Sequence, residues 1–186
     1  MSGDWRPTGQ RIPSLEPDQW SDEVRQLLNP SPRPLHILTT LAHHPTLLAA
    51  FLPFAASLTL RGRLPRRDAE ILSLRAAWNC GSDFEWGHHR LYALAAGLGE
   101  AEVADVAKPA DAGAWAPNER ALLDAADELH RDRSLGDTTW KALAAHYDEA
   151  QCIEVIFTVG QYTTLSTVTN ALRIPLEPDL PGLPAK

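Results

Sequence analysis

Two helices joined by a tight glycine-containing turn, over residues 65–97, constrain the fold more than any other part of the sequence. The stretch reads PRRDAEILSLRAAWNCGSDFEWGHHRLYALAAG. Pro65 suits the first turn of a helix, and the apolar residues after it recur with the helical period. Ser82, with Glu85 three residues later, has the form of a capping box that begins a second helix, and Gly97 suits its end. The rest of the chain is expected to form a helical shell around this pair.

The chain is expected to divide into an arm, one helical domain and a tail. Residues 1–34 are proline-rich and polar and predict an extended arm with a short helix, whereas residues 35–174 predict the helical domain. Residues 175–186 carry four prolines and predict an extended tail. Within the domain, residues 45–60 are dense in leucine and phenylalanine, so we expect a mostly buried helix with a kink at Pro53.

Four further helices are expected in the second half of the chain. They cover residues 100–106, 119–130, 138–147 and the stretch from 149 to about 172. The last stretch is rich in β-branched residues, which leaves a strand as the alternative there.

Composition excludes several classes of function. The 186 residues carry a formal charge of −7, without the clustered lysine and arginine of a nucleic-acid footprint. No run of about 18 apolar residues predicts a membrane span, and the N-terminus lacks the apolar core of a secretory signal, so we expect a cytoplasmic protein. Cys80 and Cys152 are expected to be free thiols. The histidines fit no zinc spacing, so we predict no metal.

Glu70, Glu85 and His89 are the candidate catalytic residues. Glu85 and His89 are four residues apart and share one helix face, and Glu70 on the preceding helix is expected to point the same way. Buried between helices, two carboxylates and one imidazole would have the shifted pKa values that proton transfer at neutral pH requires. In the alternative, Glu85 only caps its helix and His89 is a core histidine. Glu70 then pairs with Arg66 or Arg67, three or four residues earlier.

Several other residues are weaker candidates. Adjacent His88 points about 100° away from His89 and is expected to be exposed. Cys80 lies ahead of the second helix, where a helix N-terminus favours a thiolate, so it is a possible functional thiol. The remaining candidates are expected to line the substrate pocket or to belong to the core: Trp78, Tyr92, Gln161 and Tyr162.

The segments RRDAEILSLRAAW and SDFEWGHHRLYALAAGL resemble the carboxymuconolactone decarboxylase family, within the AhpD-like superfamily. The resemblance covers roughly residues 35–180. Thiol-dependent AhpD-like peroxidases carry Glu-x11-Cys-x2-Cys-x3-His, and in this chain that frame reads Glu70, Ser82, Glu85 and His89. Both cysteines are absent, so a disulfide cycle cannot run. The decarboxylase branch, with Glu-x-x-x-His and no cysteine in that helix, resembles the chain better.

This resemblance implies an all-α, AhpD-like fold with antiparallel helix pairs around a central motif helix. It also implies a homo-oligomer, trimeric or hexameric, and an enzyme that uses no cofactor. We expect acid–base chemistry of the lyase or decarboxylase type on a small carbonyl, lactone or carboxylate compound. Glu85 and His89 would move the proton, Glu70 would orient His89, and Arg67 would hold an anionic substrate group.

Two other functions stay open at this point. One is an AhpD-like peroxidase activity in which Cys80 acts as a lone thiol that an external partner reduces. The other is a non-catalytic, ligand-binding oligomer that has kept the fold. Thiol oxidation by a peroxide would favour the first alternative, and a site open to the outside would favour the second.

Overall fold

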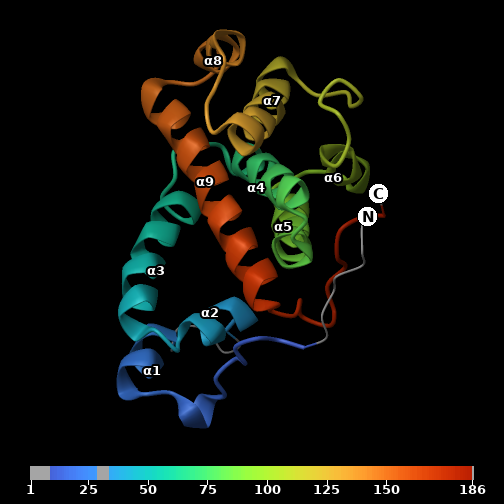
Figure 1. The fold of residues 1–186 in the computed structure, drawn as a ribbon. Coiled ribbons are helices and arrows are strands. Elements are labelled where there is room, and N and C mark those ends of the chain that lie inside the picture. Colours follow the sequence, from blue (N-terminus) through green and yellow to red (C-terminus); the bar gives the residue numbers. More distant parts are fainter. Residues whose placement is uncertain (1–8, 29–33, 186) are drawn as a thin grey trace.

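A computed structural model describes residues 9–28 and 34–185 of the chain. Within these ranges the backbone forms α-helices, one 3₁₀ helix at Pro17–Gln19 and no β-strand (Figure 1), which confirms the expected all-α class. In chain order, the α-helices are α1 (Asp22–Leu28), α2 (His36–Leu41), α3 (Pro45–Thr59), α4 (Arg66–Cys80), α5 (Asp83–Ala95), α6 (Glu100–Val106), α7 (Pro117–Asp132), α8 (Asp137–Ala144) and α9 (Glu149–Leu172).

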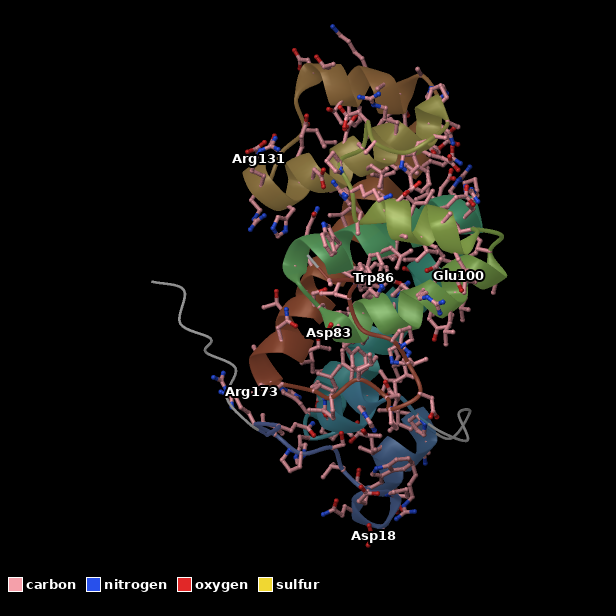
Figure 2. The ribbon with its side chains drawn as sticks, turned by 90° about the vertical axis from the view of Figure 1, so that its right-hand side faces the viewer. Asp18, Asp83, Trp86, Glu100, Arg131 and Arg173 are labelled. Carbon is pink, nitrogen blue, oxygen red and sulfur yellow. The ribbon has the colours of Figure 1, made fainter. Side chains whose placement is uncertain are left out.

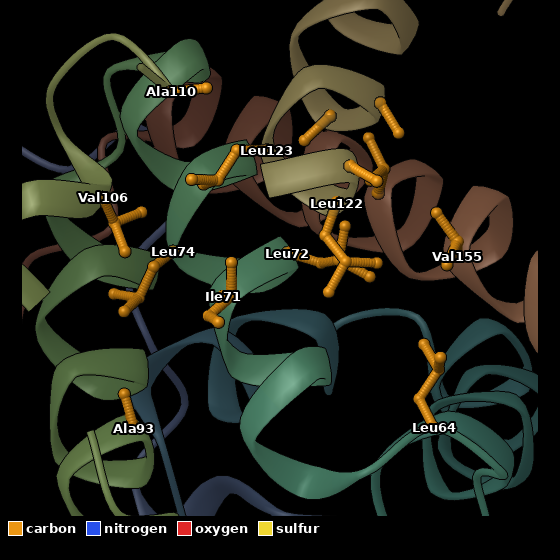
Figure 3. Close-up of a cluster of buried hydrophobic side chains, with 14 of the residues drawn as sticks. Leu64, Ile71, Leu72, Leu74, Ala93, Val106, Ala110, Leu122, Leu123 and Val155 are labelled. Carbon is orange, nitrogen blue, oxygen red and sulfur yellow. The ribbon is translucent and has the colours of Figure 1, made fainter. Parts of the chain in front are cut away.

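Helix α4 is the centre of the bundle. It packs on α5, α7 and α9, and the long helix α9 also packs along α3 (Figure 1). The main hydrophobic core lies around α4 and is closed by leucines and valines from the neighbouring helices (Figure 3). Its most deeply buried members are Ile71, Leu72, Leu74, Val106, Leu122, Leu123, Leu143 and Val155.

The junction between α4 and α5 fixes how the two motif helices meet. Gly81 has a φ of 62°, in the left-handed region that glycine adopts without the steric cost of a Cβ, and it caps the C-terminus of α4. Ser82 then caps α5, its Oγ accepting from the backbone N–H of Glu85 at 3.2 Å. Helix α4 therefore ends at Cys80, and α5 begins directly after Ser82, where the sequence predicts its start.

Helix α3 is less buried than its sequence indicates. Leu48 is fully covered, but Leu47, Phe54 and Leu60 are 48%, 40% and 82% exposed. The reason is that α1, α2 and α9 are the main packing partners of α3 and leave much of its apolar surface uncovered. The helix runs through Pro53 without ending there.

Helices in the second half follow the predicted order with shifted ends. Helix α7 begins at Pro117 with Ala116 as N-cap, and α8 begins at Asp137 with Gly136 as N-cap, so both helices begin before the predicted positions 119 and 138. The segment for which a strand was the alternative is the helix α9. Asp148 caps α9, accepting from the backbone N–H of Gln151 at 2.8 Å.

After α9 the chain forms a tail without regular helix that crosses α5. Figure 2 looks onto this face, with Asp83 and Trp86 of α5 beside the tail. The backbone N–H of Leu183 donates to Asp83 Oδ1 at 2.9 Å, and Leu176 lies so close to Gly87 that a Cβ there would meet it at 2.8 Å. Helix α5 is therefore held between α4 and the tail. No helix among the described residues is both long and apolar enough to cross a bilayer.

Candidate active site

A cavity of about 410 Å³ lies between α2, α3, α5 and α9. This volume is typical of pockets that hold small ligands. Most of its wall is aliphatic or aromatic, including Leu35, Ile37, Leu38, Phe51, Leu52 and Leu60. The polar part of the wall comes from α5, α9 and the start of α4.

Glu70, His89 and Glu85 form one buried chain of proton-carrying groups. His89 Nδ1 lies 2.6 Å from Glu70 Oε2, and His89 Nε2 lies 3.8 Å from Glu85 Oε2. All three residues are at least nine-tenths buried. Because the Glu70 carboxylate accepts at Nδ1, the neutral imidazole carries its proton there and turns the unprotonated Nε2 toward Glu85.

Glu70 sits behind His89, whereas His89 and Glu85 both reach the cavity. The second oxygen of Glu70 lies 2.5 Å from Arg66 Nη2, outside hydrogen-bond alignment, and the pair is an ion pair one helical turn apart. Arg66 also donates from Nη1 to the Thr59 carbonyl at 2.8 Å and lies 5.8 Å from the ring centroid of Tyr92. Glu70 therefore holds both His89 and the arginine beside the cavity.

Glu85 keeps a carboxyl group in a mostly apolar environment. Burial raises its pKa above the ordinary value of 4.5, and the neighbouring His89 and His88 offset that rise only in part. Its Oε1 is buried and has no hydrogen-bond partner among the described residues. The Ser82 backbone N–H donates instead to the Ala77 carbonyl at 3.0 Å, so the reciprocal half of the expected capping box is absent. The carboxyl of Glu85 is therefore not used in helix capping, and it lines the cavity.

His88 is buried, contrary to the exposed position expected for it. Its Nε2 lies 2.6 Å from Glu177 Oε2 of the tail, and its ring stacks near Phe84 on the cavity wall. Burial alone would raise the pKa of Glu177, but hydrogen bonds from His88 and from the His36 backbone N–H lower it to about 2. The tail thus supplies the carboxylate partner of His88, whereas Glu70 of α4 supplies that of His89.

Three of the weaker candidates also meet at the cavity. Tyr162 packs edge-on against His89 with ring centroids 4.3 Å apart, and Tyr92 does so at 5.5 Å. Burial raises the pKa of both phenols, and nearby Glu70 adds to the rise, so both remain neutral hydroxyls. Gln161 precedes Tyr162 on α9 and also lines the wall.

Arg67, Trp78 and Cys80 lie outside the cavity wall. Arg67 turns to the other side of α4, where it pairs with Glu102 and donates to Glu119 Oε1 at 2.7 Å, so it does not reach the substrate. Trp78 packs against the main core beside Trp86, with ring centroids 6.1 Å apart.

Cys80 lies at the opposite end of α4 from Arg66, where its Sγ lies 3.7 Å from His130 Nδ1. Burial raises the pKa of the thiol, which disfavours the thiolate that a peroxidase needs. Cys80 is therefore neither activated nor placed next to Glu85 and His89.

Sequence reasoning left the pairing of Glu70 with Arg66 as an alternative, did not place Arg66 at the cavity, and missed Glu177. The four-residue spacing between Arg66 and Glu70 is a usable signal, because it places both on one helix face. No local signal marks Glu177, since its partner His88 is 89 residues away in the sequence. The assembled site offers an imidazole, a carboxyl whose pKa is raised by burial and a mostly apolar cavity, which together suit general acid–base catalysis.

Residues 45–128 match the model of the carboxymuconolactone decarboxylase family. These residues run from α3 to α7 and contain Glu70, Glu85 and His89. No curated protein matches the chain in sequence.

Several solved structures share the fold. An uncharacterised peroxidase-related protein with an alkylhydroperoxidase AhpD core, from Ralstonia eutropha JMP134, superposes with a TM-score of 0.81 at 17% identity, over 94% of this chain and 95% of that one. A peroxidase-related protein from Silicibacter sp. TM1040 has a TM-score of 0.78 at 13% identity, over 95% and 97%.

A cysteine-to-alanine variant of the debrominase Bmp8, in complex with 2,3,4-tribromopyrrole, has a TM-score of 0.72 at 16% identity, over 91% of this chain and 93% of that one. At these sequence identities the superpositions show a common fold. The activity of this chain has to be inferred from its own site residues. The carboxymuconolactone decarboxylase family model thus matches the part of the chain that carries the candidate site, and the superpositions show that the chain has the AhpD-like fold.

Proposed function

We propose that the chain is a cofactor-independent enzyme that moves protons on a small, enolisable carbonyl compound or lactone. The observation that carries this proposal is the line from Glu70 through His89 to Glu85, which ends at the wall of the cavity. Each group has one role: His89 is the base, Glu85 is the acid, and Glu70 orients the imidazole and stabilises its charged form.

The reaction begins with neutral His89 and protonated Glu85. His89 Nε2 removes a proton from the carbon next to the carbonyl, the C–H electron pair forms a C=C bond to the carbonyl carbon, and the C=O π pair moves onto the oxygen. Glu85 donates its proton to the carbonyl oxygen, so the product is an enol, an imidazolium and a carboxylate. Glu70 stabilises the imidazolium through the 2.6 Å contact at Nδ1. Return of a proton to carbon, from the same or another side, completes exchange or isomerisation and restores both groups.

Decarboxylation would use the same groups. Loss of CO₂ from a carboxylate on the carbon next to a carbonyl leaves an enolate, and protonation of that carbon requires an acid such as Glu85. This variant needs a cation to bind the carboxylate, and the arginine expected for that role, Arg67, is held by Glu102 and Glu119. Proton transfer on a carbonyl compound therefore fits the residues better than decarboxylation does.

The position of Cys80 argues against the thiol peroxidase alternative, because it shares no cavity with the glutamates and histidine. The AhpD-like fold is also known to hold a small ring, since Bmp8 is described in complex with 2,3,4-tribromopyrrole. That complex supports a small ring-shaped substrate and gives no information on the reaction of this chain.

The test is exchange of carbon-bound hydrogen for deuterium, followed by NMR in heavy water. A panel of small cyclic ketones and lactones, headed by 2-tetralone, is incubated with the wild type, Glu85→Gln, His89→Asn and the remote control Glu119→Gln. We expect exchange above the buffer rate in the wild type and the control, and a loss of roughly 10²–10⁴-fold in the other two. No acceleration for any compound, or full rates in both site variants with the fold intact by circular dichroism, would contradict the proposal.

A further inference from the structure

The cavity wall has no positive charge to spare for an anionic ligand. Among its lining residues, Arg66 is the one lysine or arginine, and it is 2.5 Å from the Glu70 carboxylate and bonded to the Thr59 carbonyl. His88 and His89 also reach the wall, and each is bonded at 2.6 Å to a carboxylate, Glu177 and Glu70. Each group that can carry a positive charge therefore already faces a carboxylate, with Arg66 and His89 sharing Glu70.

The same wall carries acceptors that lack a donor. Gln161 is 95% buried, with 5% of its surface exposed, and its Oε1 has no hydrogen-bond partner among the described residues. Glu85 Oε1 is in the same condition on the facing helix. A buried acceptor that is left unpaired is costly, so a ligand that brings a hydroxyl or N–H to it gains binding energy that an aprotic ligand does not.

Building on the proposed function, we infer that the substrate is an uncharged, largely apolar, ring-sized molecule, and that Gln161 determines specificity by accepting a hydrogen bond from it. The aliphatic and aromatic wall holds the ring. Gln161 Oε1 accepts from a hydroxyl or N–H of the substrate, or from the hydroxyl of the enol that the reaction produces. An acidic substrate would bring a negative charge into a cavity whose Arg66, His88 and His89 already face Glu70 or Glu177, which is unfavourable in a buried site.

The test uses three naphthalene probes that differ in one group: 2-naphthol, which is neutral and has a donor; 2-methoxynaphthalene, which is neutral and has none; and 2-naphthoate, which is an anion. Calorimetric titration gives a dissociation constant for each with the wild type. We expect 2-naphthol to bind about 3–10-fold more tightly than 2-methoxynaphthalene, as one neutral hydrogen bond allows, and 2-naphthoate to bind most weakly.

In Gln161→Leu the difference between the two neutral probes should disappear, with the affinity for 2-methoxynaphthalene kept within about 2-fold. Thr164→Val, a substitution one helical turn along α9 outside the cavity wall, is the matched control and should retain the preference. Tightest binding of 2-naphthoate, a preference that survives Gln161→Leu, or no binding of any probe would each overturn the inference. The ranking in the wild type decides the matter even where Gln161→Leu fails to fold.

The binding experiment and the deuterium exchange experiment test two different claims, and either claim can fail without the other. If the probes rank as expected while Glu85→Gln keeps the full rate of deuterium exchange, the inference of a neutral substrate is supported and the catalytic role of Glu85 is contradicted. If Glu85→Gln loses deuterium exchange while 2-naphthoate binds most tightly, the proposed function is supported and the inference of an uncharged substrate is contradicted.

Discussion

Replacing Glu177 with glutamine should loosen the tail that covers α5. The carboxylate of Glu177 accepts from His88 at 2.6 Å and from the backbone N–H of His36 at 3.0 Å, so one side chain joins the tail to α5 and to the start of α2. Glutamine can keep part of this geometry and loses the charge.

The magnitude follows from the pKa of Glu177, which folding lowers from 4.5 to about 2. A shift of that size corresponds to about 3.4 kcal/mol at full strength, at about 1.36 kcal/mol per unit. Only 14% of the side chain is exposed, but it lies in a thin surface tail where solvent screens the charge. We therefore expect Glu177→Gln to lower the free energy of unfolding by about 1–2 kcal/mol at pH 7.

The assay is urea unfolding of the wild type and Glu177→Gln between pH 7 and pH 2. Because the folded-state pKa is depressed, the carboxylate stabilises the protein above pH 4.5, and that contribution is lost as the pH falls toward about 2. The difference between the two proteins should shrink over the same range. The matched control is Asp179→Asn, at an exposed carboxylate of the same tail, which should show no such trend. A difference that is independent of pH would refute the assignment of the stabilisation to the charge of Glu177.

Three further predictions concern other buried groups. Since the pKa of Glu85 is raised in the folded state, the wild type should lose stability relative to Glu85→Gln as the pH rises above 4.5, and parallel unfolding curves would contradict this. Cys80→Ser combined with Cys152→Ser should leave the deuterium exchange rate within a few-fold, and a large loss would reopen the thiol mechanism. Arg75→Met should cost about 3 kcal/mol in thermal unfolding, because it removes the ion pair with Asp127 and the donor to the Val106 and Lys108 carbonyls, whereas Arg120→Met, in an exposed pair, should change little.

Local signals predicted much of the fold from the sequence. The α4–α5 pair followed from Pro65, Gly81 and Ser82, because proline, glycine and serine have strong and separate preferences at helix ends. The burial of α3 did not follow, since a helix that is apolar on most of its surface does not reveal how many partners will cover it.

Local sequence signals also predicted part of the candidate site. Glu85 and His89 lie one turn apart on a single helix, so their proximity followed from the helical period. The choice between Arg66 and Arg67 depended on the rotation of α4, which the mixed polar and apolar sequence of that helix did not define. His88 and Glu177 could not be paired, because that contact depends on the path of a tail without regular structure.

The central claim is that Glu85 and His89 act as one unit on a proton, and a double-mutant cycle on deuterium exchange into 2-tetralone tests it most directly. Rates are measured for the wild type, Glu85→Gln, His89→Asn and the double variant, with folding checked by circular dichroism. The account predicts that the double variant is no more than about 3-fold slower than the slower single variant, because residues of one proton relay are coupled. Losses that multiply, or single variants that exchange at the wild-type rate, would contradict it.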